Sequence, residues 1–202
     1  MADRIRAIAR LIGSAQRVFD IGCGHQQLAA ALPDRWVIAA DRVPHIVADV
    51  GPRIADGRLV ADGLTALAAT PGCVVCAGMG ERAMAAWLQA PALVAAQRLV
   101  LNPSPQPYTL RAALAEAGWY CADEDLVYAN GRYHVLIAAE RGHEASTDQD
   151  ALLIGPRLVE LRHPLLPGFL ADALQRRPHA RGNSPEACFL HAARRCLDGL
   201  DG

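Results

Sequence analysis

The sequence predicts an α/β fold: a mainly parallel seven-stranded sheet that ends in an antiparallel hairpin and is followed by a small helical C-terminal appendage. Three observations lead to this prediction. Short apolar runs alternate with longer amphipathic runs, which is typical of the strands and helices of a parallel α/β sheet. Asn130 and Gly131 separate two strand-like runs, and this pair favours the tight turn of a hairpin. Beyond residue 141 the chain becomes polar and then rich in proline.

The alternating part of the chain supplies the strand–helix units. In the first expected helix, Ile5, Ile8, Leu11 and Ile12 share one face, as an amphipathic helix on a sheet requires. The short apolar runs have the length of buried strands. The expected strands span residues 17–22, 36–41, 58–62, 73–77 and 98–101, and the expected helices span residues 3–14, 26–32, 44–54, 64–69, 81–88 and 108–117.

The rhythm changes after the fifth unit. Strand-like runs at residues 120–129 and 133–140 form the expected hairpin. Five strand–helix units closed by a hairpin are the layout of a Rossmann-like class I methyltransferase fold, whereas plain dinucleotide-binding domains usually end with another parallel strand. A polar linker at residues 142–150 follows. We therefore expect a catalytic domain at residues 1–141 and a short helical appendage at residues 142–202.

Composition limits the function classes. Hydrophobic residues make up 52% of the chain. No apolar run reaches the roughly 20 residues that span a bilayer, so we expect a soluble cytoplasmic protein without a membrane partner. The formal net charge of -1 gives no overall attraction to nucleic acid. Cys73 and Cys76 lie in an expected strand, where residues three apart point to opposite faces, so we expect no metal site.

The strongest chemical signal is the loop after the first strand, which reads Asp20-Ile21-Gly22-Cys23-Gly24. Glycines let the backbone turn tightly and approach a ligand, and the next helix offers its positive N-terminus to a carboxylate. An acidic residue two positions before the first glycine is typical of sites for S-adenosylmethionine (SAM). We therefore expect Asp20, Gly22, Cys23 and Gly24 to contact the methionyl part of SAM. The alternative is a turn that only packs helix on strand.

Acidic residues also follow the next two strands. Asp41 closes the second strand, where a carboxylate accepts hydrogen bonds from ribose hydroxyls, and Arg42 adjoins it. Asp62 and Gly63 follow the third strand, where an acceptor commonly meets the adenine amino group. A helix cap at the start of a short helix from Leu64 is the alternative role for Asp62. These positions extend the expected SAM site along the sheet edge.

A second glycine-containing loop follows the fourth strand. It reads Ala77-Gly78-Met79-Gly80 and lies where the methyl group and its acceptor would meet. We expect Ala77 and Gly78 to contact the cofactor, and glycine lets a flat substrate approach the backbone. A simple strand-to-helix turn explains these glycines equally well.

In these segments the sequence resembles the bacterial TrmK family, which uses SAM to methylate N1 of the adenosine at tRNA position 22. The resemblance covers about residues 5–140. The segments that carry it are Asp20-Ile-Gly-x-x-His25, Asp62-Gly63-Leu64, Ala77-Gly78-Met79-Gly80, Leu101-x-Pro103, Leu110-Arg111, Gly118-Trp119 and Gly131-Arg-Tyr133. The sequence departs from the family pattern at Gly24, at Glu81 and at Asn102-Pro103-Ser104. Its tail is also shorter than the family's long, lysine-rich one and is broken by prolines.

The resemblance implies a tRNA adenine-N1-methyltransferase with SAM as cofactor. N1 of adenine carries a lone pair that attacks the sulfonium methyl directly, so the main contribution of the enzyme is in-line positioning. Met79, Asn102 and His25 are the expected contacts to the adenine edge. His25 could also act as a base or only cap the helix.

A tRNA substrate requires local positive charge. The expected RNA contacts are Arg4, Arg6 and Arg10 in the first helix and Arg176, Arg177 and Arg181 in the tail. We expect a monomer or weak dimer. Three alternatives stay open: a small-molecule methyltransferase, a SAM- or nucleotide-binding module without activity, and an NAD-dependent dehydrogenase, against which the expected hairpin argues.

Overall fold

The computed structural model describes residues 2–24, 27–48, 55–104, 107–146, 148–177 and 182–200. Its strands are β1 (Arg17–Ile21), β2 (Trp36–Asp41), β3 (Gly57–Val60), β4 (Gly72–Ala77), β5 (Ala96–Asn102), β6 (Trp119–Ala129) and β7 (Arg132–Arg141). Its helices are α1 (Ala2–Leu11), α2 (Gln27–Ala31), α3 (Pro44–Ala48), α4 (Glu81–Trp87), the 3-10 helix η1 (Pro91–Ala95), α5 (Leu110–Glu116), α6 (Gln149–Ile154), α7 (Pro156–Glu160), α8 (Leu166–Arg176) and α9 (Pro185–Leu200).

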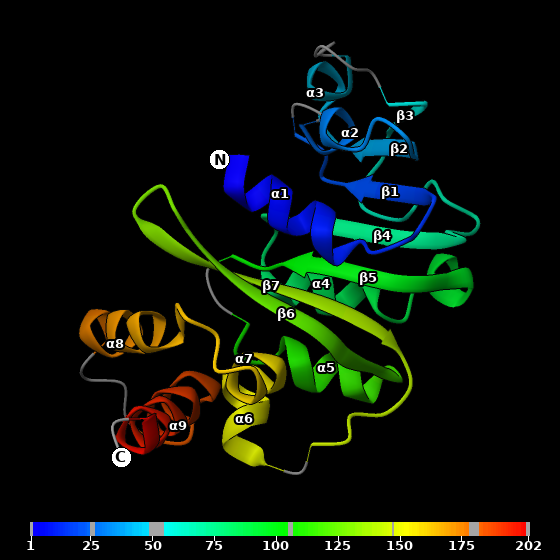
Figure 1. Cartoon of the computed structure of the whole chain (residues 1–202). Helices are drawn as coiled ribbons and strands as arrows, with labels where there is room; N and C mark the ends of the chain where they lie inside the picture. The colour runs from blue at the N-terminus through cyan, green and yellow to red at the C-terminus, as the bar shows by residue number, and fades with distance from the viewer. Residues whose placement is uncertain are drawn as a thin grey trace.

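One seven-stranded sheet forms the centre of the molecule, with the strand order β3-β2-β1-β4-β5-β7-β6 (Figure 1). Strands β1 to β5 pair in parallel. Strand β7 pairs antiparallel with β5, and β6 pairs antiparallel with β7. The predicted fold class is therefore confirmed. Because the parallel strands end at the same sheet edge, the loops that follow them meet there.

Different helices cover the two faces of the sheet. Helices α1 and α2 pack on one face, where Ile8 and Leu28 meet Val75. On the other face, α4, α5 and the tail helices share one cluster with the sheet, in which Phe169 of α8 belongs with Val74 of β4. The core of the tail is thus continuous with the core of the sheet. The division at residue 141 stays a prediction.

Strand β4 separates the two cysteines of the Cys-Val-Val-Cys segment. Cys73 packs in the cluster under α1, and Cys76 packs in the cluster under α4. The two side chains therefore point to opposite faces, as predicted. All six cysteines are free. Among the described residues, no group of three or more metal-ligating side chains comes together.

The hairpin turns at the two residues that the sequence indicates. Asn130 has a φ of 53° and Gly131 a φ of 72°, so both turn residues lie in the left-handed region. This conformation suits asparagine and glycine and matches the twist of the flanking strands. Tyr128 and Tyr133 face each other across the turn, with ring centroids 4.8 Å apart.

The prediction of a helix at residues 64–69 is wrong. Gly63 has a φ of 60°. Both the backbone nitrogen and the hydroxyl of Thr65 donate to the carbonyl of Asp62, at 3.3 Å and 2.8 Å. These local bonds close a turn and compete with a helical path. The first helix also ends at Leu11, three residues earlier than predicted, because Gly13 turns left-handed with a φ of 65°.

The tail is helical, as predicted. It contains α6, α7, α8 and α9, the last with 16 residues. The carboxylate of Asp148 caps α6 by accepting from the backbone nitrogens of Asp150 and Ala151 at 2.9 Å and 3.2 Å, so the polar linker ends there. In the described part of the chain no helix has both the length and the apolar character needed to cross a membrane.

Candidate functional site

A cleft runs along the edge where the parallel strands end. One cavity of about 250 Å³ lies over β1 and is lined by Asp20, Cys23, Gly24 and further residues of α1 and α2. A second cavity of about 350 Å³ lies over β2 and β3 and is lined by residues that include Asp41, Asp62 and Gly78. Gly22 and Ala77 line both cavities, so the two cavities adjoin along this edge of the sheet.

The glycine loop follows β1, leads toward α2 and is hydrogen-bonded to the neighbouring strand β2. The backbone nitrogens of Gly22 and Cys23 both donate to the carbonyl of Ala40, at 2.8 Å and 3.1 Å. Gly22 has a φ of 74° and Gly24 a φ of 51°. A side chain would strain the backbone at both positions. The backbone conformation of the loop therefore favours glycine at both positions.

Asp20 is the buried acidic residue in the wall of the first cavity. Only 4% of the residue is exposed, and no hydrogen bond from the described residues reaches its carboxylate. Burial, with a smaller contribution from the negative charge of Asp41, raises the pKa of Asp20 to about 7. A positively charged ligand group in the cavity would reverse this effect by favouring the ionised carboxylate.

The second cavity holds the remaining acids of the predicted cofactor site. Oδ1 of Asp41 accepts from the backbone nitrogen of Val43 at 3.0 Å, which leaves Oδ2 for a ligand. Asp62 is exposed, and its predicted alternative as a helix cap fails because no helix begins at Leu64. Gly63 lies against α4: a Cβ there would come within 2.6 Å of the Trp87 ring.

The loops after β4 and β5 are tied together beside the cleft. The nitrogen of Gly78 donates to the carbonyl of Asn102 at 2.9 Å, and the nitrogen of Ser104 donates to the carbonyl of Met79 at 2.9 Å. Two of the predicted catalytic residues, Met79 and Asn102, are therefore brought together. The third, His25, lies outside the described residues.

The side chain of Asn102 bonds to the protein at both ends of its amide. Its Nδ2 donates to the carbonyl of Val135 at 2.9 Å, and its Oδ1 accepts from the guanidinium of Arg4 at 3.1 Å. Only 2% of Asn102 is exposed. Asn102 is thereby positioned to fix the loop after β5, and it holds Arg4 in the wall of the first cavity.

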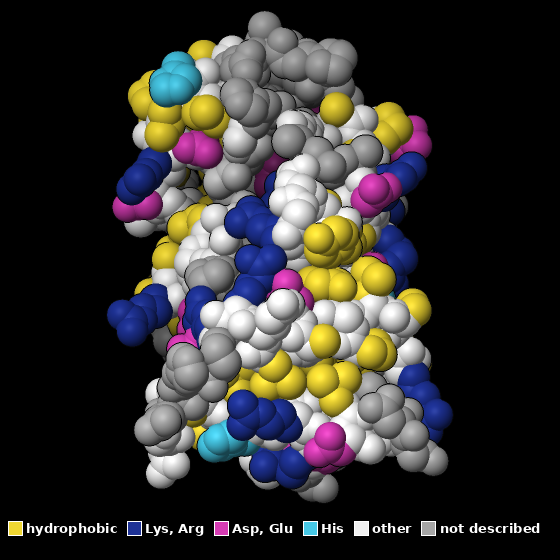
Figure 2. Space-filling view, turned by 90° about the vertical axis from the view of Figure 1, so that its left-hand side faces the viewer, with side chains coloured by type: hydrophobic (Ala, Val, Ile, Leu, Met, Phe, Trp, Pro, Cys, Tyr) yellow, Lys and Arg dark blue, Asp and Glu magenta, His cyan; other side chains and the backbone are white. Residues whose placement is uncertain are grey.

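Most of the arginines predicted to contact RNA are paired with acids. Arg6 pairs with Asp3, and Arg10 contacts Asp123 and Asp125 at 2.9 Å and 3.1 Å. Arg176 lies 2.8 Å from Asp172, and Arg177 pairs with Glu186. Arg42 is exposed beside Asp41, and Arg181 lies outside the described residues. Figure 2 shows basic side chains near the middle of the face that it presents.

Glu81 has a role that sequence reasoning missed. Its Oε2 accepts from the backbone nitrogen of Thr109 at 2.9 Å, just before α5. The carboxylate thus ties the start of α4 to the start of α5. The only signal in the sequence was the acidic residue itself, at a position where the chain departs from the pattern of the family that it resembles. Its partner 28 residues away could not be read from spacing.

Comparison with known proteins shows the family and the fold of the chain. A family model described as a methyltransferase domain matches residues 1–137. The fold is similar to that of the B. subtilis m1A22 tRNA methyltransferase TrmK, with a TM-score of 0.76, 18% identity, and coverage of 96% of this chain and 97% of that one. M. capricolum TrmK, solved with S-adenosyl-homocysteine, gives a TM-score of 0.72 at 13% identity, with 98% of both chains covered.

A further solved structure agrees with these two. A protein of the NADB-Rossmann superfamily from Streptococcus agalactiae gives a TM-score of 0.80 at 22% identity, with coverage of 98% of this chain and 97% of that one. No curated protein sequence matches the chain. All three structural alignments extend over the tail.

Proposed function

Because the chain belongs to the methyltransferase-domain family, we propose that it transfers the methyl group of SAM to N1 of an adenosine in tRNA, with position 22 favoured. The observation that carries the proposal is the structural likeness to two m1A22 tRNA methyltransferases over nearly the whole of each chain. The protein would act in the cytoplasm, where its tRNA substrate is found, as a monomer or weak dimer.

The cleft fits SAM in an extended conformation. The methionyl ammonium group would lie at Asp20, beside the backbone of Gly22, Cys23 and Gly24. The ribose hydroxyls would donate to Asp41, and the adenine amino group would donate to Asp62. The two adjoining cavities support this arrangement, and a buried unpaired carboxylate such as Asp20 calls for a cationic partner.

When bound, SAM supplies an activated methyl group on a sulfonium. N1 of adenine is neutral at pH 7 and attacks with its own lone pair, so the N1–carbon bond forms as the carbon–sulfur bond breaks. The product base then carries the positive charge. The residues of this chain would position the base: Asn102 and Met79 fix the two loops beside the methyl group. Such positioning is worth up to about 7–11 kcal/mol when the geometry is ideal.

Mass spectrometry of tRNA tests this function. Purified protein, SAM and unmodified tRNA should give 1-methyladenosine, and tRNA from a deletion strain should lack the modification at the same position. If SAM binds but no tRNA is methylated, the result favours a methyltransferase for a small molecule over the proposed function. The pairing of Arg6, Arg10, Arg176 and Arg177 with acids would also suit that second function.

Replacing Asp41 with Ala should weaken SAM binding by about 10- to 100-fold, because a hydrogen bond to a charged group contributes roughly 1.5–3 kcal/mol. Isothermal titration calorimetry measures the change. Asp34→Ala, which removes an exposed acid before β2, is the matched control and should leave the affinity unchanged. Equal affinities for both variants would remove Asp41 from the site.

Replacing both Arg176 and Arg177 with Gln should weaken tRNA binding by about tenfold and leave SAM binding unchanged. Each lost phosphate contact should also reduce the salt dependence of binding by about one unit of slope. Filter binding at several salt concentrations checks both effects. Arg195→Gln on α9, which breaks an exposed pair with Asp150 of α6, controls for general loss of charge. A double variant that behaves like this control would exclude the tail arginines.

A further inference from the structure

The first cavity contains one acidic and one basic side chain that no protein group of opposite charge neutralises. Of the described residues that line this cavity, Asp20 and Arg4 are the charged ones. Asp20 belongs to β1, whereas Arg4 belongs to α1, where Ile5 and Ile8 lie on the same face of the helix and line the same cavity. The cavity therefore presents a negative and a positive group from two different elements.

The guanidinium of Arg4 is held in place by Asn102. Nη1 of Arg4 donates to Oδ1 of Asn102 at 3.1 Å, and Nδ2 of Asn102 donates to the carbonyl of Val135 at 2.9 Å, so the two bonds fix the orientation of the amide. A guanidinium has five N–H donors in a planar fork. The bond to Asn102 is the one hydrogen bond that the Arg4 side chain makes among the described residues. Its other donors remain available to a ligand.

Neither of the two charges is balanced. No acid among the described residues forms an ion pair with Arg4. Burial, with a smaller contribution from the charge of Arg132, lowers the pKa of Arg4, whereas burial and the charge of Asp41 raise the pKa of Asp20. Both shifts reflect the removal of a charge from water without a counter-charge beside it. A ligand that carries an anionic and a cationic group would oppose both shifts.

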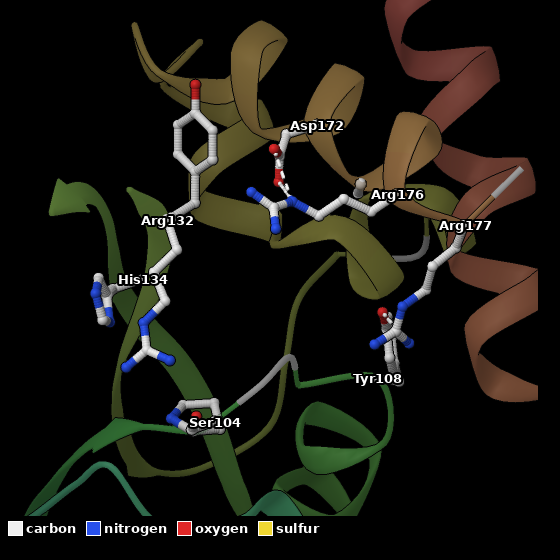
Figure 3. Close-up of a pocket in the computed structure, with 10 residues that line it drawn as sticks. Ser104, Tyr108, Arg132, His134, Asp172, Arg176 and Arg177 are labelled. Atoms are coloured by element: carbon white, nitrogen blue, oxygen red, sulfur yellow. Dashed lines mark hydrogen bonds and ion pairs between the residues drawn. The ribbon is translucent and has the colours of Figure 1, made fainter. Parts of the chain in front are cut away.

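The neighbouring pocket between the β6–β7 hairpin and α8 offers no such combination. Arg176 lies 2.8 Å from Asp172 there, and Arg177 pairs with Glu186 (Figure 3). Arg132 has no acidic partner among the described residues, but Asp172, the acid that lines this pocket, is already paired. The first cavity is therefore the better site for a ligand with charges of both signs.

An α-amino acid group has the chemistry that the first cavity requires. Its ammonium and its carboxylate are attached to one carbon atom, and a carboxylate accepts two parallel hydrogen bonds from a guanidinium. The sequence favours the N-terminus of the next helix as the partner of the carboxylate, but a helix terminus carries only roughly half a charge. That helix, α2, has five residues. The full charge of Arg4 makes it the stronger partner.

We propose that Arg4 binds the carboxylate of the methionyl end of SAM while Asp20 binds the ammonium group, so that α1 and β1 together hold the zwitterion. Arg4 is then a cofactor contact rather than the RNA contact that the sequence predicts. The proposal rests on the part of the proposed function that concerns SAM, and it does not depend on which molecule accepts the methyl group.

Replacing Arg4 with Gln should weaken SAM binding by about 10- to 100-fold, because a hydrogen-bonded charge pair is lost. Isothermal titration calorimetry measures the change. Arg6→Gln is the matched control and should bind SAM like the wild type, because Arg6 lies on the same helix, is exposed and pairs with Asp3. Arg4→Lys keeps the charge without the planar fork and should recover part of the affinity. If Arg4→Gln and Arg6→Gln bind SAM equally well, the proposal is overturned.

A ligand without the carboxylate separates this contact from a general disturbance of α1. Decarboxylated SAM keeps the ammonium and the sulfonium. The wild-type protein should bind it about 10- to 100-fold more weakly than SAM, whereas Arg4→Gln should bind the two ligands about equally, since its contact is already lost. If Arg4→Gln loses the same factor with both ligands, Arg4 acts only through the packing of α1 and the proposal is wrong.

Binding of tRNA distinguishes the carboxylate from a phosphate of the substrate. In filter binding without SAM, Arg4→Gln should bind tRNA like the wild type. A variant with undiminished SAM affinity but with weaker tRNA binding, and a salt dependence lower by about one unit of slope, would show that the anion is a phosphate and overturn the proposal.

Two further results separate this proposal from the proposed function. A wild-type protein that shows the expected pattern with SAM and decarboxylated SAM but methylates no tRNA would support the carboxylate contact and contradict the proposed acceptor. A wild-type protein that binds no SAM would contradict both.

Discussion

Replacing Asp20 with Asn should abolish most SAM binding, with a loss of at least about 30-fold. A buried carboxylate paired with a ligand ammonium contributes roughly 2–5 kcal/mol when one partner is truncated. In the wild-type protein the affinity should also fall about tenfold for each pH unit below 7, because the pKa of Asp20 is about 7 and the proposed pairing with the SAM ammonium needs the ionised carboxylate. Calorimetry from pH 5.5 to 8 measures both effects.

The same substitution should stabilise the protein without SAM. The pKa of Asp20 is raised from about 3.9 in the unfolded chain to about 7, so the folded state binds the extra proton and loses stability as the pH rises from about 4 to 7. Above pH 7, Asp20→Asn should therefore raise the Tm, and at pH 4 it should not. Asp34→Asn, at an exposed position, is the control. A lower Tm at pH 8 and undiminished SAM binding would both contradict this role.

Replacing Glu124 with Gln should reduce the free energy of unfolding by about 3–5 kcal/mol, because it leaves the charge of Arg111 buried without its partner. Oε1 of Glu124 lies 2.7–2.8 Å from two guanidinium nitrogens of Arg111. Its Oε2 accepts from the backbone nitrogen of Arg157 at 3.0 Å. Arg111 also donates to the carbonyl of Leu153 at 3.1 Å. The pair therefore joins α5 and β6 to the first two helices of the tail.

Urea denaturation measures the loss, and an exposed pair provides the comparison. Glu160→Gln breaks a contact with Arg157 in which the Glu160 side chain is 59% exposed, so it should cost at most about 1 kcal/mol. The Glu124 side chain is fully buried. If the two variants lose similar stability, the buried pair does not couple the tail to the sheet.

The strands and the hairpin could be predicted because local signals decide them. Continuous apolar runs mark buried parallel strands, and Asn130 and Gly131 accept the left-handed conformation that the turn requires. The helix expected at residues 64–69 failed because Thr65 bonds locally to Asp62, and apolar spacing does not report such a bond. The helices of the tail were expected, but their bounds were not, since only packing against the sheet fixes them.

The candidate site was predictable only in part. Asp20, Asp41 and Asp62 lie at or just beyond the ends of three neighbouring parallel strands, so topology alone brings them to one edge of the sheet. The contact between Arg4 and Asn102 joins residues 98 positions apart, and no spacing rule reveals it. The free guanidinium of Arg132 likewise depends on which arginines find acids after folding. Sequence patterns locate strand ends, whereas charge balance at a surface is a property of the folded chain.

The packing of Trp87 on Gly63 gives the protein an intrinsic optical reporter. Trp36 lies beside Arg17, away from the cleft, and Trp119 is buried beneath the Arg141 guanidinium, so only the Trp87 indole adjoins a residue that lines the cofactor cleft. A ligand that enters next to Gly63 changes the polarity and collisional quenching around that indole. Steady-state emission should therefore follow occupancy of the proposed cofactor cleft in unlabelled protein, and Trp87→Phe should remove the signal.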